Sequence, residues 1–135
     1  MNIYFAGAIR GGREKVNDYV KIVNKLQEIG NVLTTHVADT NLSNKGENNL
    51  SLKEIYDRDV EWLKSSELIV AEISIPSLGI GYELGLAESL GKKVICLYDI
   101  NSDKTLSAMI GGNDNFEIVK YNSIDEVLEY LEKLK

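Results

Sequence analysis

A strand-like segment followed by a glycine-rich turn and a helical pattern is the feature that most restricts how this chain can fold. Residues 68–73 form an apolar run with the length of a buried strand. Residues 76–85 contain Pro76 and three glycines, and apolar residues then recur at helical spacing as far as Leu90. A strand, a tight turn and a helix in this order are typical of an open α/β sheet, in which ligands bind where strand ends meet helix starts.

Glu83 is the candidate reactive residue of this junction. We expect it in or near the first turn of the helix, where the helix dipole favours an ionised carboxylate by about 0.3–1 kcal/mol. An ionised carboxylate held in a cleft can act as a nucleophile or a base. The alternative is an ordinary acidic residue of a first helical turn. Gly79 and Gly81 favour a site, because they allow a ligand to approach the backbone closely.

The rest of the chain continues the alternation of strand and helix patterns. Ser51 and Glu54 have the spacing of a capping box, and Ser123 can cap the last helix. Further strands are expected at residues 2–6, 32–34, 93–98 and 116–120, and helices at 13–28, 52–65, 105–110 and from Ser123 to about 134. The alternation predicts a single α/β domain over residues 1–135, with a parallel sheet of about five strands and helices on both faces.

The composition argues against several functional classes. The net charge of −6 disfavours a broad nucleic-acid surface. No apolar run approaches the ~20 residues that span a bilayer, and no basic leader precedes the first apolar run. One cysteine and one histidine argue against a transition-metal site, and Cys96 is expected to be a buried thiol. We therefore expect a cytoplasmic protein without a metal, which binds neither a nucleic acid polymer nor a membrane.

The loop after the first strand has the composition of an anion-binding site. Residues 7–13 contain three glycines and two arginines, and they lie between a strand and a helix. Arg10 and Arg13 could hold a phosphate through charge-assisted hydrogen bonds. The spacing matches neither a dinucleotide-binding fingerprint nor a P-loop. A solvated surface loop explains the pattern equally well.

Asp59 is a second candidate acidic residue. Its spacing places it on one helical face with Ile55, Trp62 and Leu63. An acid on an otherwise apolar face needs a partner or a function. The alternative is an acid that caps a neighbouring element.

Three further side chains have both a functional and a structural interpretation. Tyr4 alternates with Ile3 and Phe5 in the first strand, and core packing is the simpler explanation for it. His36 follows the second strand, and a lone histidine is more often structural than reactive. Ser107 lies in a possible turn of helix that could expose its hydroxyl.

Several of these segments resemble one known family. Residues 3–13, 32–37, 59–63, 76–85 and 106–110 are similar, in order, to segments of the 2'-deoxynucleoside 5'-monophosphate N-hydrolases. Those enzymes belong to the nucleoside 2-deoxyribosyltransferase superfamily. The resemblance implies a flavodoxin-like or Rossmann-like sheet, a homodimer and no cofactor. It also implies cleavage of the bond between base and sugar in a nucleoside 5'-monophosphate.

The resemblance implies roles for individual residues. Glu83 corresponds to the nucleophile at the anomeric carbon, Asp59 to the acid that orients the sugar or assists departure of the base, and Tyr4 to a residue that supports the nucleophile and the sugar. Ser107 corresponds to a segment that reaches into the partner subunit's site. The residues expected to contact substrate are Gly7, Ala8, Ile9, Arg10, Gly11, Gly12, Arg13, Tyr19, Ser77, Gly79, Ser107, Ala108 and Met109. The hydrolases usually carry serine where this chain has Ala8, so one hydroxyl donor to the phosphate is missing.

Three other functions remain open at this point. A deoxyribosyltransferase would move the sugar of a free nucleoside between bases. Transferases of the superfamily tend to carry aspartate where this chain has Ser77, and a carboxylate there would repel a 5'-phosphate. A ribonucleotide hydrolase acting on CMP is the second alternative, since no residue indicates how the 2' position is recognised. A nucleotide-binding sensor without turnover is the third, and the presence of both Glu83 and Asp59 disfavours it.

Overall fold

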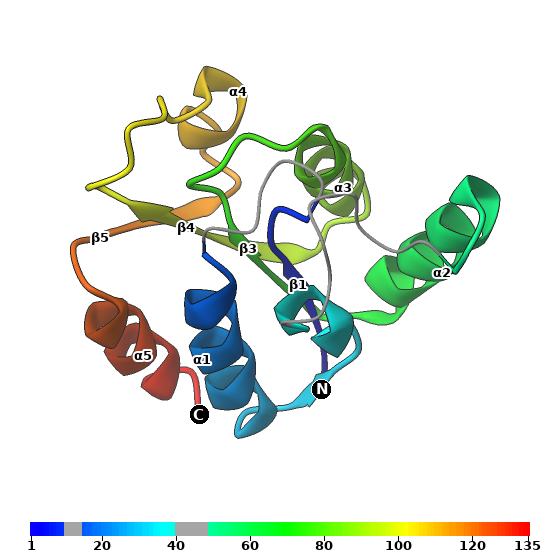
Figure 1. Cartoon of the computed structure of the whole chain (residues 1–135), viewed down its shortest axis with the longest axis horizontal. Helices are drawn as coiled ribbons and strands as arrows, with labels where there is room; N and C mark the ends of the chain where they lie inside the picture. Colours follow the sequence, from blue (N-terminus) through cyan, green and yellow to red (C-terminus); the bar gives the residue numbers. More distant parts are fainter. Residues whose placement is uncertain (10–14, 40–48) are drawn as a thin grey trace.

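The computed structural model describes residues 1–9, 15–39 and 49–135 (Figure 1). Within these residues, a parallel sheet of five strands in the order β2-β1-β3-β4-β5 forms the centre. The strands are β1 Asn2–Ala6, β2 Asn31–Val32, β3 Leu68–Glu72, β4 Lys93–Asp99 and β5 Glu117–Tyr121. This strand order is that of flavodoxin-like folds. The predicted α/β class and the parallel pairing of the five strands are therefore confirmed.

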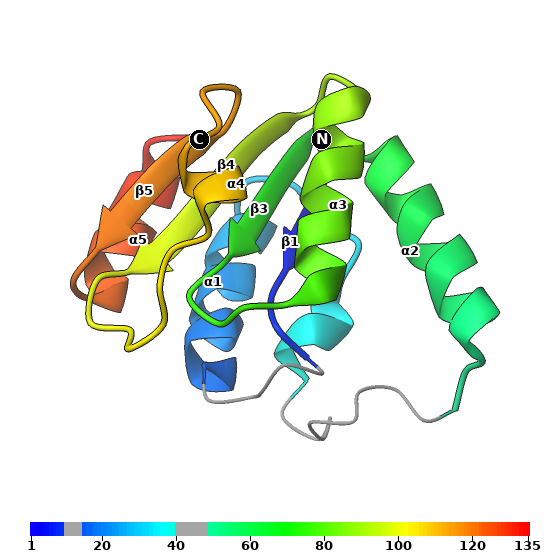
Figure 2. The ribbon, with the colours of Figure 1, turned by 90° about the horizontal axis from the view of Figure 1, so that it is seen from above.

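Helices cover both faces of this sheet. They are α1 Val16–Gln27, the 3-10 helix η1 Thr35–Ala38, α2 Leu52–Ser65, α3 Leu78–Ser89, the short α4 Ala108–Gly111 and α5 Ile124–Glu132. Helices α1 and α5 pack on one face and α2 and α3 on the other, so that two separate cores form (Figures 1 and 2). None of the described helices has the length and apolar character needed to cross a membrane.

The central strand β3 explains the continuous apolar run in the sequence. It lies between β1 and β4 and is buried over its whole length. Leu68 and Val70 belong to the core under α1 and α5, whereas Ile69 and Ala71 belong to the core under α2 and α3. A strand buried on both faces needs apolar residues on both, so no polar alternation appears. Glu72, at the carboxyl end, is the charged exception and is also fully buried.

Helix ends follow the local sequence signals. The Ser51 hydroxyl accepts the N–H of Glu54 at 3.1 Å, and the Glu54 carboxylate accepts the N–H of Ser51 at 3.0 Å, which confirms the predicted capping box of α2. At the start of α5, Glu126 accepts the N–H of Ser123 at 2.8 Å. Gly91 follows α3 with a φ of 69°, a conformation that residues other than glycine rarely adopt.

Two elements differ from the prediction. The strand expected at 32–34 ends at Val32. Beyond it, the hydroxyl of Thr34 makes the hydrogen bonds to the backbone of Phe5. It accepts the N–H of Phe5 at 2.8 Å and donates to its carbonyl at 2.7 Å. The helix expected at 105–110 begins only at Ala108, because Ser107 has a non-helical ψ of 130°.

Helix α1 buries a different side from the one expected. The predicted apolar side combined Val23 and Leu26 with Val16 and Val20, but the last two are only partly buried. The fully packed positions of the helix are Tyr19, Ile22, Val23 and Leu26. The aromatic ring of Tyr19 thus occupies the core position expected for a valine. Residues 13 and 14 of the predicted helix lie outside the described residues.

The single cysteine of the chain is part of the core. Cys96 lies in β4 and has no exposed surface. Burial raises the pKa of its thiol to about 12. The predicted buried thiol is therefore confirmed.

Candidate active site

The candidate site lies between α2 and α3. A cavity of about 260 Å³ separates these helices, close to the lower end of the ~300–1,000 Å³ that is usual for ligand pockets. Asp59 from α2 and Glu83 from α3 face it. The other lining residues are mainly apolar: Leu52, Ile55, Tyr56, Val60, Leu63, Gly79, Tyr82 and Leu86. In the part of the chain that the structure describes, no group of three or more potential metal ligands occurs.

The Glu83 carboxylate accepts a hydrogen bond from the hydroxyl of Tyr4, which is almost completely buried in β1. Burial raises the pKa of Glu83 to about 7. The Tyr4 hydrogen bond opposes this rise, and the charge of Asp59 adds to it. Burial and the charges of Glu83 and Asp59 raise the pKa of the Tyr4 phenol, so Tyr4 stays a donor. A carboxyl group that titrates near neutral pH beside a second carboxylate is typical of a catalytic site.

The prediction placed Glu83 in or near the first turn of α3, and the structure places it just after that turn. The hydroxyl of Ser77 caps the helix by accepting the N–H of Ile80 at 3.3 Å, which puts Glu83 in the second turn. The helix dipole acts mainly on the first turn. The dipole should therefore favour the ionised form less than expected, and burial is the largest cause of the raised pKa of Glu83.

Asp59 has a cationic neighbour that other side chains hold in place. Arg58 Nη2 lies 2.8 Å from Asp59 Oδ1, and the guanidinium stacks on Trp62 at 4.7 Å from the ring centroid. Arg58 Nη2 also lies 3.2 Å from Nε2 of His36, which comes from η1. His36 therefore contacts the residue that pairs with Asp59. Sequence patterns identified Asp59 but missed Arg58, although its i, i+4 spacing from Trp62 is typical of such a stack.

Only the first part of the expected phosphate loop falls in the described ranges. Gly7 and Ala8 are buried there, and Ile9 is partly exposed. The remaining residues of the predicted loop, which lie outside the described residues, are Arg10, Gly11, Gly12 and Arg13.

Tyr19 supports this loop from the core. Its hydroxyl accepts the N–H of Ala8 at 3.0 Å, and its side chain is fully buried. A Cβ at Gly7 would lie 2.8 Å from Cζ of Tyr19, so only glycine permits this close approach. The N–H of Ala8 is already engaged, and Tyr19 lies under the backbone of the loop.

Ser77 and Gly79 lie beside Glu83 at the start of α3. A Cβ at Gly79 would be 3.8 Å from both Glu83 Oε1 and Ser77 Oγ. The predicted phosphate donor and the predicted nucleophile are thus close together, on either side of this glycine. Gly81 does not lie against either side chain, because a Cβ there would meet no atom of the described residues within 4 Å.

Ser107, Ala108 and Met109 lie away from this cavity. They form the start of α4, and none of them is among the residues that line the cavity. All three are exposed, and 85% of the Met109 surface is accessible. Within one chain, the structure brings together Glu83, Asp59, Ser77 and Gly79, with Tyr4 behind Glu83, but not the Ser107 segment.

A flavodoxin-like sheet with two acidic side chains in one cavity is consistent with a family of enzymes that act on nucleosides. The sequence model of the nucleoside 2-deoxyribosyltransferase family matches residues 3–118. The chain belongs to this family, and the family resemblance seen in the sequence is confirmed.

Relatives within the family are nucleotide N-hydrolases by name. A 5-hydroxymethyl-dUMP N-hydrolase from Danio rerio is 52% identical over 136 residues, which cover 98% of this chain and 94% of the relative. The protein of the same name from Tetraodon nigroviridis is 46% identical, over 98% of this chain and 95% of the relative. Among solved structures, a CMP N-glycosidase from Clostridium botulinum matches all of both chains with a TM-score of 0.74 and 21% identity, which shows a shared fold.

Proposed function

We propose that this protein hydrolyses the N-glycosidic bond of a 2'-deoxynucleoside 5'-monophosphate and releases the free base and 2-deoxyribose 5-phosphate. The observation that carries the proposal is Glu83, a carboxyl group with a pKa near 7 that faces a cavity together with Asp59. The names of relatives that are 46% and 52% identical over nearly the whole chain support it. They also make 5-hydroxymethyl-dUMP the first substrate to test.

In the proposed reaction, Glu83 acts as the nucleophile. Its carboxylate attacks the anomeric carbon, the bond to the base nitrogen breaks, and the base leaves with the electron pair and takes up a proton. Water then attacks the same carbon of the sugar–enzyme ester and restores the Glu83 carboxylate. The transition state resembles an oxocarbenium ion, which a neighbouring carboxylate stabilises. A sugar without a 2'-hydroxyl forms that cation more readily, so a deoxynucleotide is the easier substrate.

The other residues of the site position the substrate. Asp59, paired with Arg58, orients the sugar or assists departure of the base. Ser77 donates to the 5'-phosphate, together with Arg10 and the backbone of the loop that begins at Gly7. Tyr4 holds the Glu83 carboxylate through its hydroxyl.

The test is incubation of the protein with matched substrates, followed by chromatography for free base. The panel contains 5-hydroxymethyl-dUMP, other deoxynucleoside monophosphates, CMP and the matching nucleosides, each with and without an acceptor base. We expect faster release of base from a deoxynucleotide than from its nucleoside, and no new nucleoside with the acceptor. Equal or faster turnover of nucleosides would contradict the hydrolase and support a transferase. Faster turnover of CMP would support a ribonucleotide hydrolase.

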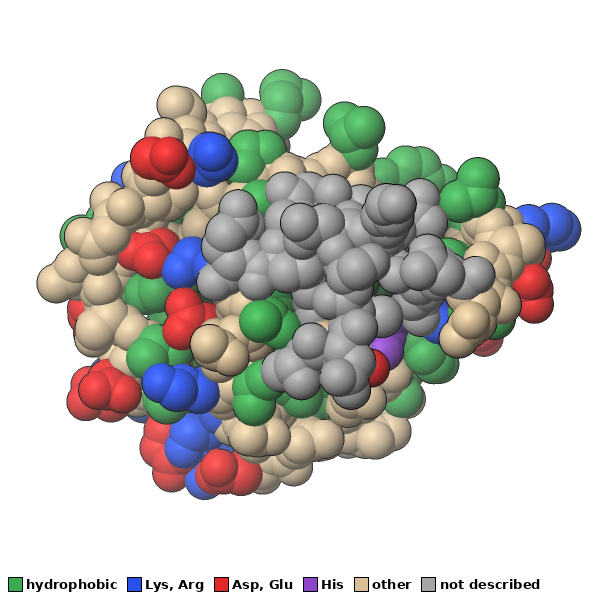
Figure 3. All heavy atoms as spheres, viewed as in Figure 1, with side chains coloured by type: hydrophobic (Ala, Val, Ile, Leu, Met, Phe, Trp, Pro, Cys, Tyr) green, Lys and Arg blue, Asp and Glu red, His purple; other side chains and the backbone are tan. Residues whose placement is uncertain are grey.

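We also propose a homodimer in which the Ser107 segment completes the partner's site. Apolar side chains are exposed on α2 and α3, which line the cavity, and on α4, as Figure 3 shows along the upper edge of the molecule. They include Met109, which is 85% exposed, and Leu78, which is 97% exposed. Exposed apolar side chains that gather on one side of a protein are typical of an interaction surface. Other exposed members are Leu52, Tyr56 and Tyr82.

Complementation between inactive variants tests the shared site. Glu83→Ala and Ser107→Ala are mixed in equal amounts and allowed to exchange subunits. About half of the dimers are then mixed, each with one intact site, so roughly a quarter of wild-type activity should return. The matched control mixes Glu83→Ala with Glu83→Gln, which cannot form an intact site. No recovery despite proven exchange would mean that Ser107 does not act in the partner's site.

The cytoplasmic location expected from the sequence stays a prediction. Its support is the composition, with one cysteine in 135 residues. Fractionation of cells that express the full chain, followed by immunodetection, is the direct measurement. Recovery in a membrane or secreted fraction would contradict it.

A further inference from the structure

The sheet holds a fully buried acidic residue, Glu72, on the face opposite to the one that α3 and Glu83 cover. Glu72 ends β3, and its position in the alternation of that strand directs it to the same side as Leu68 and Val70, under α1 and α5. The side chain has no exposed surface, and the proposed reaction does not use it. Burial of a carboxylate is unfavourable unless partners compensate for the lost water, so its partners indicate its role.

Three hydrogen bonds satisfy the Glu72 carboxylate. Ser74 donates its N–H at 2.7 Å to one oxygen and its hydroxyl at 2.9 Å to the other. The hydroxyl of Tyr121, at the end of β5, donates to the same oxygen as the Ser74 hydroxyl. Burial raises the pKa of Glu72, whereas the bonds from Tyr121 and Ser74 and the charge of Lys15 oppose the rise. Burial and the neighbouring Glu72 raise the pKa of Tyr121, so its phenol stays a donor.

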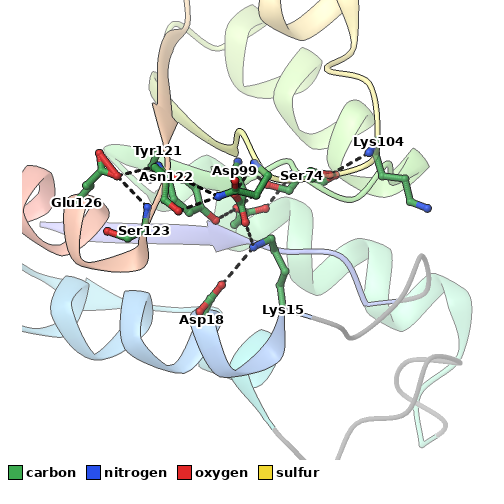
Figure 4. Close-up of polar contacts among 12 residues, drawn as sticks. Lys15, Asp18, Ser74, Asp99, Lys104, Tyr121, Asn122, Ser123 and Glu126 are labelled. Atoms are coloured by element: carbon green, nitrogen blue, oxygen red, sulfur yellow. Dashed lines mark hydrogen bonds and ion pairs between the residues drawn. The ribbon is translucent and has the colours of Figure 1, made fainter.

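Lys15 connects this cluster to the start of α1 (Figure 4). Its ammonium group lies 2.8 Å from Asp99 Oδ2 and 3.2 Å from Asp18 Oδ2. The same group lies over the ring of Tyr121, 5.6 Å from its centroid. Since Asp99 ends β4 and Tyr121 ends β5, these contacts tie the start of α1 to the carboxyl ends of two strands.

Ser74 connects the cluster to two segments that lead to the candidate site. Its hydroxyl accepts the N–H of Asp99 at 2.8 Å, and its carbonyl accepts the hydroxyl of Ser102 at 3.1 Å. In the chain, Ser74 leads directly to Ser77, the N-cap of α3, and Ser102 leads to Ser107, the N-cap of α4. Glu72 is thus connected, through the hydrogen bonds of Ser74, to the two segments that carry Ser77 and Ser107.

We infer that Glu72 and Tyr121 form a positioning pair, which holds the Ser77 segment in place for the 5'-phosphate of the substrate and the Ser107 segment in place for the partner's site. The inference rests on the proposed function, because it assumes that both serines serve substrate binding. The pair lies on the opposite face of the sheet from Tyr4 and Glu83. Its loss therefore weakens substrate binding and leaves the bond-breaking step unchanged.

The test compares Tyr121→Phe with Tyr130→Phe. The first change removes one donor from Glu72 with little change of volume. Tyr130 is the matched control, because its hydroxyl also bonds a glutamate, Glu117, away from Ser74. With 5-hydroxymethyl-dUMP, we expect Tyr121→Phe to raise KM about tenfold with kcat within about twofold of wild type, and Tyr130→Phe to change neither.

A merely structural role of the pair gives a different result. It lowers the melting temperature and the active fraction of the enzyme, so that kcat falls while KM stays the same. Glu72→Gln, which replaces one of the two acceptor oxygens by an NH2 group, must change KM in the same direction as Tyr121→Phe. An unchanged KM in Tyr121→Phe overturns the inference, whatever its melting temperature.

A second measurement does not need turnover. In the Glu83→Gln background the substrate stays intact, and 5-hydroxymethyl-dUMP should raise the melting temperature. The same concentration should raise it less in Glu83→Gln/Tyr121→Phe, and equal shifts overturn the inference. A wild-type protein that binds but does not cleave contradicts the proposed function, while the shifts still decide the role of the pair. If the protein shows no cleavage and no shift of the melting temperature, the result contradicts both the proposed function and the inference.

Discussion

Glu83 and Glu72 are acidic residues on opposite faces of one sheet, and their surroundings differ in one respect. Glu72 has three hydrogen-bond donors from Ser74 and Tyr121, and no exposed surface. Glu83 faces a cavity, and Tyr4 is the one hydrogen-bond donor identified for it among the described residues. Burial raises the pKa of both carboxyl groups, but at Glu83 little opposes the rise.

This difference separates a carboxylate that holds structure from one that is available for chemistry. A fully buried carboxylate whose partners all lie inside the protein cannot be reached by a ligand. A carboxylate with one donor beside a cavity keeps lone pairs for an incoming atom, and a pKa near pH 7 lets it change charge during a reaction. The assignment of Glu83 to catalysis and of Glu72 to positioning follows from their partners, and the three variants below test it.

Glu83→Gln should have the largest effect. The change keeps the volume and removes the nucleophile, so turnover should fall about 10⁴-fold or more. Far-UV circular dichroism should be unchanged, because the amide fits the same space. Chromatographic assay of free base measures the effect, with Tyr130→Phe as the control. A variant that keeps a tenth of the wild-type rate would exclude Glu83 as the nucleophile.

Glu72→Gln should mainly lower stability, whereas Glu83→Gln should mainly lower turnover. The amide replaces one of the two acceptor oxygens of Glu72 by an NH2 group, which then faces either the N–H of Ser74 or the hydroxyls of Ser74 and Tyr121, and a buried unsatisfied group costs about 1–3 kcal/mol in the free energy of unfolding. Urea denaturation at pH 7 measures this cost. Glu117→Gln, a change of an exposed glutamate on β5, is the control and should cost much less. Equal costs of the two changes would show that the partners of Glu72 contribute nothing.

Tyr4→Phe should have a smaller and pH-dependent effect. The nucleophile must be ionised, so kcat/KM of the wild type should rise with pH through about 7, the pKa of Glu83. The Tyr4 hydrogen bond lowers that pKa, so its removal should move the midpoint to higher pH and reduce kcat/KM at pH 7 about tenfold. Part of the loss should be recovered at pH 9. A midpoint that does not move would mean that Tyr4 does not act on the ionisation of Glu83.

The smallest effect should appear in stability as a function of pH. The pKa of Glu83 is about 7 in the folded protein and about 4.3 in an unfolded chain. The protonated carboxyl therefore contributes stability that is complete below about pH 4 and is lost as pH rises through about 7. Glu83→Gln should thus gain stability relative to wild type as pH rises from about 4 to 8.5. A difference between the two proteins that stays constant over this range would contradict the unfavourable burial of this charge.

The fold was predictable where local signals decide it. The capping box of Ser51 and Glu54, and the buried run of β3, depend on residues close together in the chain, and both were predicted correctly. The shorter β2 depends on a long-range contact between Thr34 and Phe5, which no local pattern indicates. For the same reason the side chain of Tyr19, which packs against Gly7, was not expected in the core of α1.

The candidate site was predictable as a set of residues but not as a geometry. Glu83 was identified from its place after a strand and a glycine turn, and Asp59 from its helical spacing; the cavity that both line is consistent with that identification. The raised pKa of Glu83 was not predicted, because it depends on burial in the folded protein. Glu72 was passed over, although a charged residue at the end of an apolar strand is a signal that it needs partners in the core.

Chemical labelling of the Cys96 thiol can report unfolding of this protein. Cys96 is the one cysteine in the sequence, it is fully buried in β4 between β3 and β5, and its pKa of about 12 keeps it protonated. An alkylating reagent can therefore modify the chain only after the centre of the sheet has opened. The rate of labelling measures that opening directly at protein concentrations too low for calorimetry, without any added probe, and it can be compared between variants by mass spectrometry.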